Sequence, residues 1–130
     1  MNRILHTMLR VSDLTRSIDF YRNVMGMKLL RTLEQNDEGY TLAFLGYAEE
    51  SETSVLELTY NHGVSEYDMG NAYGHIAIGV ENIVRTVAAI KKLGGKFSLE
   101  ATPLKNSNEV IAFVNDPDGY QIELIERPDI

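Results

Sequence analysis

The chain has 130 residues, enough for one domain or two small and closely packed modules, and its 44% hydrophobic content is ordinary for a globular protein. A formal net charge of -7 argues against nucleic acid or an anionic membrane as the main partner, because both would repel the chain at neutral pH. Cysteine is absent, so disulfides are excluded and any metal must be held by nitrogen and oxygen atoms. Without a signal-type apolar core before the first predicted strand, we expect a cytoplasmic protein.

The first half of the sequence predicts a strand, a helix and three further strands. Residues 4–11 alternate in character, so His6 and Arg10 share one face of a strand whose other face is apolar. A helix is expected from a cap at residue 12 or 13 to residue 25, and Gly26 would end it. The remaining strands are expected at 27–32, 40–47 and 54–60, with a polar hairpin loop at 33–39.

The second half repeats the first with an offset of 69 residues, which drops to 66 after a shorter closing turn. The pairs that this offset relates are His6 with His75, Ala43-Phe44-Leu45 with Ala112-Phe113-Val114, and Glu57 with Glu123. Each copy therefore carries one histidine and one glutamate at matching places.

This repeat predicts an α+β fold built from two βαβββ modules. We expect a single domain over 1–130, with modules at about 4–60 and 73–127 joined by a linker at about 61–72. In the second module a helix is expected at 81–93 and strands at 75–80, 96–99, 110–114 and 120–126. Residues 101–109 are polar, include Lys105, and are a candidate for a mobile flap.

The matching histidines and glutamates suggest a metal centre. Glu57 and Glu123 lie between apolar neighbours on predicted strands, where an unpaired carboxylate would be costly to bury. Taken singly, His6 would be a satisfied histidine on a sheet and each glutamate an edge-strand residue facing solvent. Their recurrence at the same two repeat positions favours a common role instead, because four such buried polar side chains would need a common compensation, and a metal ion provides one. Two imidazoles and two carboxylates form a neutral site for nickel, cobalt, zinc, iron or manganese.

Two further residues suggest a small anionic ligand. Arg10 lies four residues after His6, and Asn61 lies four after Glu57, so both project from the face that carries the ligands. Arginine binds carboxylates through two hydrogen bonds and asparagine pairs with amides, a combination that suits a small peptide. The alternative is an arginine in a surface ion pair and an asparagine in a turn, and His62 is interpreted as a turn residue.

Several segments together resemble the glyoxalase I (lactoylglutathione lyase) family of the vicinal oxygen chelate superfamily, over nearly the whole chain. They are Leu5-His6-Thr7-Met8-Leu9-Arg10-Val11, Arg16-Ser17-Ile18-Asp19-Phe20-Tyr21, Leu56-Glu57-Leu58-Thr59-Tyr60-Asn61, Tyr73-Gly74-His75-Ile76-Ala77 and Asp116-Pro117-Asp118-Gly119-Tyr120. The chain is similar to the short bacterial type, which is usually activated by nickel or cobalt rather than zinc.

The resemblance assigns roles to particular residues. It implies His6, Glu57, His75 and Glu123 as metal ligands, Arg10 and Asn61 as glutathione contacts, and Lys105 as a basic loop residue near the glutathione carboxylate. The implied reaction isomerises the hemithioacetal of methylglyoxal and glutathione to S-D-lactoylglutathione by proton transfer through an enediolate, with Glu123 as the proton shuttle and Glu57 able to share that role. The resemblance also implies that the two βαβββ modules form a curved mixed sheet around the metal site, and that the protein is a homodimer with sites between subunits.

Other functions within and outside enzymes remain open from the sequence. An epimerase or a thiol transferase of the same superfamily is the main enzymatic alternative, and an extradiol dioxygenase is less favoured at this length. A related dithiol peptide could replace glutathione. From a different class, some superfamily members sequester ligands without catalysis, but these generally lack a complete metal set. Turnover as opposed to stoichiometric capture would separate the classes.

Overall fold

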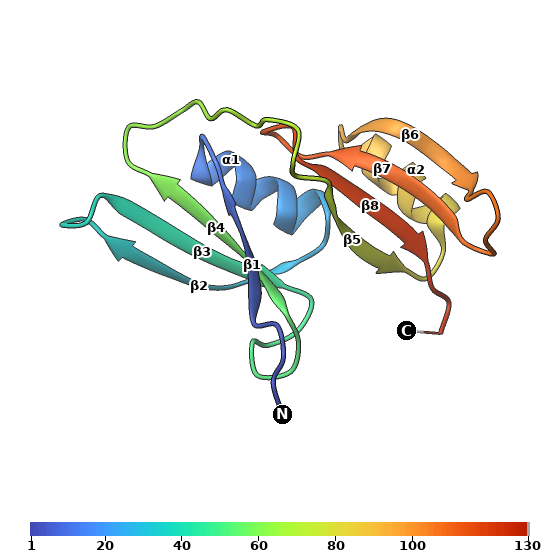
Figure 1. Cartoon of the computed structure of the whole chain (residues 1–130), viewed down its shortest axis with the longest axis horizontal. Helices are drawn as coiled ribbons and strands as arrows, with labels where there is room; N and C mark the ends of the chain where they lie inside the picture. Colours follow the sequence, from blue (N-terminus) through green and yellow to red (C-terminus); the bar gives the residue numbers. More distant parts are fainter. Residues whose placement is uncertain (130) are drawn as a thin grey trace. The chain divides into compact units, whose positions relative to one another are not determined.

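The computed structural model describes residues 1–129 and divides the chain into two compact units, one spanning Met1–Asp68 and the other beginning at Met69 (Figure 1). Each unit contains a helical segment and a four-stranded sheet in the order strand, helix, three strands, which confirms the predicted repeat of a βαβββ unit. Among the described residues, no helix is long and apolar enough to span a membrane.

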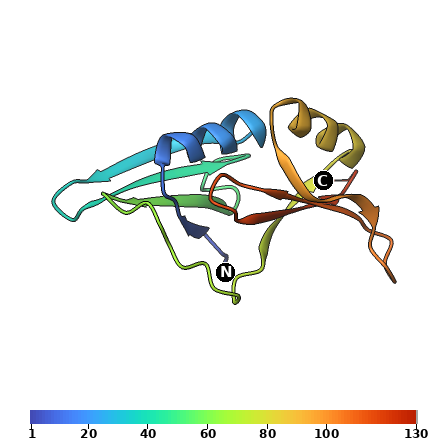
Figure 2. The ribbon, with the colours of Figure 1, turned by 90° about the horizontal axis from the view of Figure 1, so that it is seen from above.

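In the first unit, the sheet has the order β1-β4-β3-β2, with β1 parallel to β4 and the other pairs antiparallel. The chain-order elements are β1 (His6–Arg10), α1 (Leu14–Asp19), the π-helical turn η1 (Phe20–Val24), β2 (Lys28–Gln35), β3 (Tyr40–Gly46) and β4 (Val55–Asn61). Helix α1 contacts β3 and β4 and lies over one face of this sheet (Figure 2).

The helical segment of the first unit has the predicted extent but two kinds of hydrogen bonding. Asp13 is the N-cap, and its side chain accepts a hydrogen bond from the backbone N–H of Arg16 at 3.0 Å. The segment then continues as η1, where the N–H of Met25 bonds to the carbonyl of Phe20. Gly26, with φ of 77°, ends it as predicted.

The second unit repeats this arrangement, with the sheet order β5-β8-β7-β6 and β5 parallel to β8. Its elements are β5 (His75–Val80), α2 (Ile83–Lys92), β6 (Lys96–Pro103), β7 (Val110–Asn115) and β8 (Gln121–Glu126). Helix α2 begins at the N-cap Asn82, whose side chain accepts a hydrogen bond from the N–H of Arg85 at 3.0 Å. It packs on β6, β7 and β8 (Figure 2).

Two predicted loops are shorter than expected because the strands before them are longer. Strand β2 continues to Gln35, so the predicted loop at 33–39 shrinks to a turn at 36–39. Likewise β6 pairs with β7 as far as Pro103, beyond two irregularities in register, which leaves only 104–109 as loop. The predicted loop at 101–109, the candidate flap, is therefore too long by the three residues that belong to β6. A proline is tolerated at this place because β6 is an edge strand.

Each unit has its own apolar core between sheet and helix. In the first unit the fully buried side chains include Val11, Tyr21 and Leu58, and in the second they include Ile83 and Leu124. The two central strands of each sheet therefore have a covered face, which fixes their register, since a slip by one residue would turn apolar side chains outward. That register decides where the histidines and glutamates lie.

Candidate metal centre

The first His–Glu pair is set by the parallel pairing of β1 and β4. His6 lies opposite Val55, and Glu57 follows two residues later on the same face of β4. The His6 Nε2 atom is 3.4 Å from Glu57 Oε1. The imidazole is 40% exposed and the carboxylate side chain 13% exposed. The sequence prediction that these two residues belong together is thus supported by their geometry within the unit.

The second unit reproduces this pair in the same register. His75 lies opposite Gln121 on β8, and Glu123 follows two residues later. The His75 Nε2 atom is 3.1 Å from Glu123 Oε1, with side-chain exposures of 40% and 13%. The residues that the offsets of 69 and 66 relate in the sequence therefore occupy equivalent positions in the strand pairings of the two units.

The exposed fractions of the four side chains differ from the sequence-based expectation. From the sequence, all four side chains were expected to be buried and to need a common compensation. The two glutamates are nearly buried, but the imidazoles of His6 and His75 keep 40% of their surface exposed within the single chain. The desolvation cost thus falls on the carboxylates, and each imidazole presents a partly open surface beside a carboxylate.

An aromatic ring supports each histidine, and the sequence reasoning did not assign it to the site. His6 packs edge-on against Phe44 with ring centroids 5.8 Å apart, and His75 packs against Phe113 at 5.2 Å. Each phenylalanine lies directly opposite the glutamate of its pair across an antiparallel ladder. The repeat relates Phe44 to Phe113, and this correspondence was the signal in the sequence that could have assigned both rings to the site.

The first pair also has charged and polar neighbours. Thr59 Oγ1 donates a hydrogen bond to Glu57 Oε2 at 3.1 Å. The guanidinium of Arg31 lies 3.7 Å from the centre of the Phe44 ring and binds both carboxylate oxygens of Glu50, at 2.7 and 3.0 Å. The hydrogen bond to Glu50 raises the pKa of Arg31, with a smaller contribution from Glu57, and Arg31 in turn lowers the pKa of Glu50. Arg31 thus places a positive charge against the phenylalanine ring on which His6 packs.

The predicted glutathione contacts lie farther along the same strands. Arg10, at the exposed end of β1, is opposite Thr59, and Asn61 follows two residues later, which repeats the diagonal relation of His6 and Glu57. The side-chain amide of Asn61 donates to Tyr67 Oη at 3.0 Å. Tyr67 was not recognised from the sequence, because nothing in the irregular segment that follows β4 predicts this contact.

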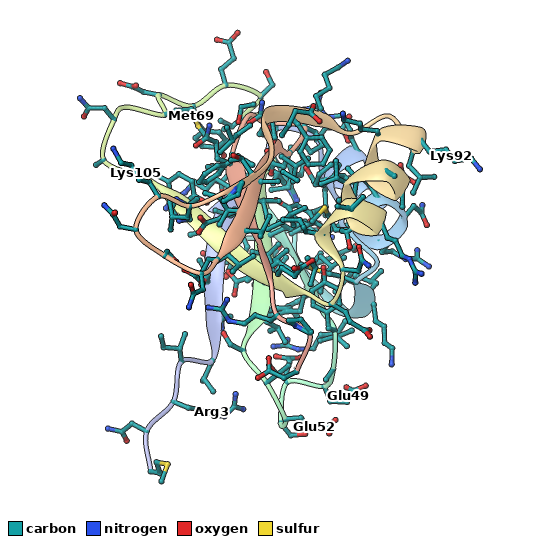
Figure 3. All side chains as sticks on the ribbon, turned by 90° about the vertical axis from the view of Figure 1, so that its right-hand side faces the viewer. Arg3, Glu49, Glu52, Met69, Lys92 and Lys105 are labelled. Atoms are coloured by element: carbon teal, nitrogen blue, oxygen red, sulfur yellow. The ribbon has the colours of Figure 1, made fainter. Side chains whose placement is uncertain are left out.

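The other residues discussed from the sequence lie on loops. His62 follows β4, and its Nε2 is 2.8 Å from Thr41 Oγ1, which agrees with its interpretation as a turn residue. Lys105 belongs to the exposed loop 104–109, and its side chain extends from that loop (Figure 3). Within each unit, the geometry thus brings one histidine and one glutamate together, whereas Lys105 lies on a loop of the second unit.

The two pairs fit a metal ion by their donor chemistry. Neighbouring ligands at about 2.1 Å from an ion are about 3 Å apart when they subtend a right angle, close to the separations in both pairs. Each pair supplies one imidazole nitrogen and one carboxylate, donors that suit a divalent transition metal. Over residues 1–129, no three potential ligand side chains gather in one place, so each unit by itself contributes one pair.

The chain is similar to known proteins over nearly its whole length. The chain is 60% identical to the lactoylglutathione lyase of Salmonella typhimurium over 98% of its own length and 94% of the relative's. It is also similar to the crystal structure of glyoxalase I from Zea mays, with a TM-score of 0.94 and 48% identity. That match covers 98% of this chain but only 45% of the maize chain.

A second solved structure resembles the chain over most of both lengths. The trypanothione-dependent glyoxalase I of Leishmania major is 49% identical, with a TM-score of 0.85, and the match covers 97% of this chain and 87% of that one. Residues 3–124 match the family described as the Glyoxalase/Bleomycin resistance protein/Dioxygenase superfamily. With its repeated βαβββ units, the chain therefore belongs to the Glyoxalase/Bleomycin resistance protein/Dioxygenase superfamily.

Proposed function

We propose that the chain is a lactoylglutathione lyase, which isomerises the hemithioacetal of methylglyoxal and glutathione to S-D-lactoylglutathione. The observation that carries the proposal is the His–Glu pair that recurs in the same register in both units. The name and 60% identity of the Salmonella typhimurium relative support the choice among the chemistries of the superfamily. The reaction serves methylglyoxal detoxification, and a cytoplasmic location remains part of the proposal.

The proposed metal ligands are His6, Glu57, His75 and Glu123. A divalent ion bound there would supply Lewis acidity toward negative charge that develops on a substrate oxygen. The chain's own residues would move the proton. Glu123 takes it from the carbon that bears sulfur and returns it to the neighbouring carbon, while the hydroxyl proton of the hemithioacetal passes to the former carbonyl oxygen, so no electrons leave the substrate. Glu57 holds its position or shares in the transfer.

The test of this function is thioester formation from methylglyoxal and glutathione by metal-stripped protein, with nickel, cobalt or zinc added back in parallel. We expect rapid turnover with nickel or cobalt and little with zinc, as in the short bacterial type. A preference for zinc would change only the metal assignment. If protein that binds one of these metals forms no product with any of them, the proposed reaction is wrong.

Trypanothione is a second thiol to include, because a structural neighbour is named as dependent on it. Faster turnover with that thiol would change the co-substrate and keep the reaction class. If neither thiol supports turnover, the epimerase and thiol transferase alternatives are the next to assay. Stoichiometric capture of a ligand without product would indicate the sequestering class.

We also propose that the protein is a homodimer in which His6 and Glu57 of one chain complete a site with His75 and Glu123 of its partner. A twofold interface generates two equivalent sites from one self-complementary surface. The maize glyoxalase I chain supports this indirectly, because this chain covers only 45% of it and the longer chain has room for about two such lengths.

Replacing Arg10 by alanine is expected to lower kcat/KM by about 10- to 100-fold, mainly through a higher KM, because a charge-assisted hydrogen bond is worth about 1.5–3 kcal/mol. Arg10→Lys should recover only part of the loss, since lysine keeps the charge but not the paired N–H donors. The control is Arg85→Ala, on the exposed surface of α2. Steady-state kinetics at varied hemithioacetal concentration would measure both constants, and an unchanged KM for Arg10→Ala would remove Arg10 from the substrate site.

A further inference from the structure

The two His–Glu pairs differ in one neighbour of the glutamate. Two residues beyond Glu57 on the same face of β4 stands Thr59, and two residues beyond Glu123 on β8 stands Ile125. Thr59 is 8% exposed, and its Oγ1 donates to Glu57 Oε2 at 3.1 Å. An isoleucine has no donor, so Glu123 receives no such bond from the matching position.

The comparison is between equivalent places. Thr59 lies opposite Leu42 on the neighbouring antiparallel strand, and Ile125 lies opposite Ile111 in the same relation. Both positions also face the parallel edge strand, β1 in one unit and β5 in the other. The difference between the two environments is therefore one of side-chain chemistry at a shared backbone position.

This neighbour gives the two carboxylates different contacts. In Glu57 one oxygen, Oε1, faces the imidazole of His6, while the other, Oε2, accepts the hydroxyl of Thr59. A carboxylate engaged at both oxygens resists rotation about its last bond. In Glu123, Oε1 faces His75, and among residues 1–129 no side-chain hydroxyl is bonded to its second oxygen.

We propose that Thr59 is a positioning residue that makes Glu57 the fixed carboxylate of the metal centre, while Ile125 leaves Glu123 free to rotate toward the substrate. The inference rests on the proposed function, because it assigns different tasks to two glutamates that the repeat makes alike. A ligand that must stay in place benefits from an outer hydrogen bond, and such partners typically contribute about 10- to 100-fold to metal affinity. A carboxylate that must carry a proton between two carbons benefits from the absence of that bond.

A purely structural role for Thr59 predicts a different pattern. A nearly buried hydroxyl needs an acceptor, and Glu57 is within reach, so the bond could serve only to satisfy Thr59 itself. In that case, losing the hydroxyl would change the stability of the fold and leave the metal affinity of the folded protein unaltered. The two roles are thus separated by a metal titration.

The first experiment titrates nickel into metal-stripped protein by calorimetry, without substrate, for Thr59→Val, Thr59→Ser and the matched control Ile125→Val. We expect Thr59→Val to bind nickel about 10- to 100-fold more weakly, Thr59→Ser to bind nearly as the wild type does, and Ile125→Val to be unchanged. Equal affinity in Thr59→Val and the wild type would overturn the role of Thr59. A wild type that binds no metal would instead overturn the metal centre and with it the proposed function.

The second experiment does not depend on the folding of Thr59→Val. The variant Ile125→Thr introduces a hydroxyl beside Glu123, at the place where Glu57 has one. We expect kcat for lactoylglutathione formation to fall about tenfold while nickel affinity is maintained or rises, because the second carboxylate becomes held as well. If kcat is unchanged in Ile125→Thr and its nickel affinity equals that of the wild type, the proposed division between the two glutamates is wrong.

Discussion

Glu123→Gln is expected to lower kcat by about 10²- to 10⁴-fold, the usual contribution of a positioned general base. Glutamine keeps the size of the side chain and one oxygen that can face a metal, but its amide does not accept a proton at neutral pH. KM should change little, since Arg10 and Asn61 lie on the other unit's strands and are untouched. Nickel should still bind, although more weakly.

The control for this variant is Glu100→Gln, because Glu100 is an exposed carboxylate that pairs with Lys91 at the surface. It removes the same charge and should leave kcat unaltered. Glu57→Gln offers a second comparison and should weaken nickel binding more than Glu123→Gln does, if Glu57 is the fixed ligand. A metal-loaded Glu123→Gln protein that turns over at the wild-type rate would refute the assignment of the proton shuttle to Glu123.

The order of elements was predictable because each rests on a local signal. Alternation marks the strands, Asp13 offers a capping carboxylate and Gly26 supplies the positive φ at the end of the helical segment. The change from the α-helix α1 to the π-helical turn η1 was not predictable, because in so short a segment the same apolar stripe is compatible with both kinds of helix. The ends of β2 and β6 were missed for another reason. Both edge strands continue into polar sequence, where pairing with the neighbouring strand decides the structure.

The part of the candidate site that recurs in both halves of the sequence was predictable. One histidine and one glutamate at equivalent places, in a chain with only 3 histidines, are a pattern that sequence alone reveals. The supporting rings of Phe44 and Phe113 and the hydroxyl of Thr59 are contacts across strands. They depend on register and side-chain direction, and a reading along one strand at a time does not provide these.

His6→Ala and His75→Ala are each expected to weaken nickel binding by more than about 100-fold, because the loss of a direct ligand should exceed the 10- to 100-fold effect of an outer partner. The matched control is His62→Ala, which removes the third histidine of the chain, bonded to Thr41 and distinct from both His–Glu pairs. Calorimetric titration of metal-stripped protein would measure the three affinities. Equal losses in all three variants would indicate a general effect on folding.

The same variants can decide whether a site is shared between subunits. If His6 and Glu57 of one chain act with His75 and Glu123 of the other, a mixed dimer of His6→Ala and Glu123→Gln chains has one site that carries both substitutions and one that carries neither. Two affinity tags would isolate the mixed dimer, which should recover about half of the wild-type turnover although each parent is inactive. If both pairs serve a site within one chain, every site in the mixture carries a substitution, and no activity returns.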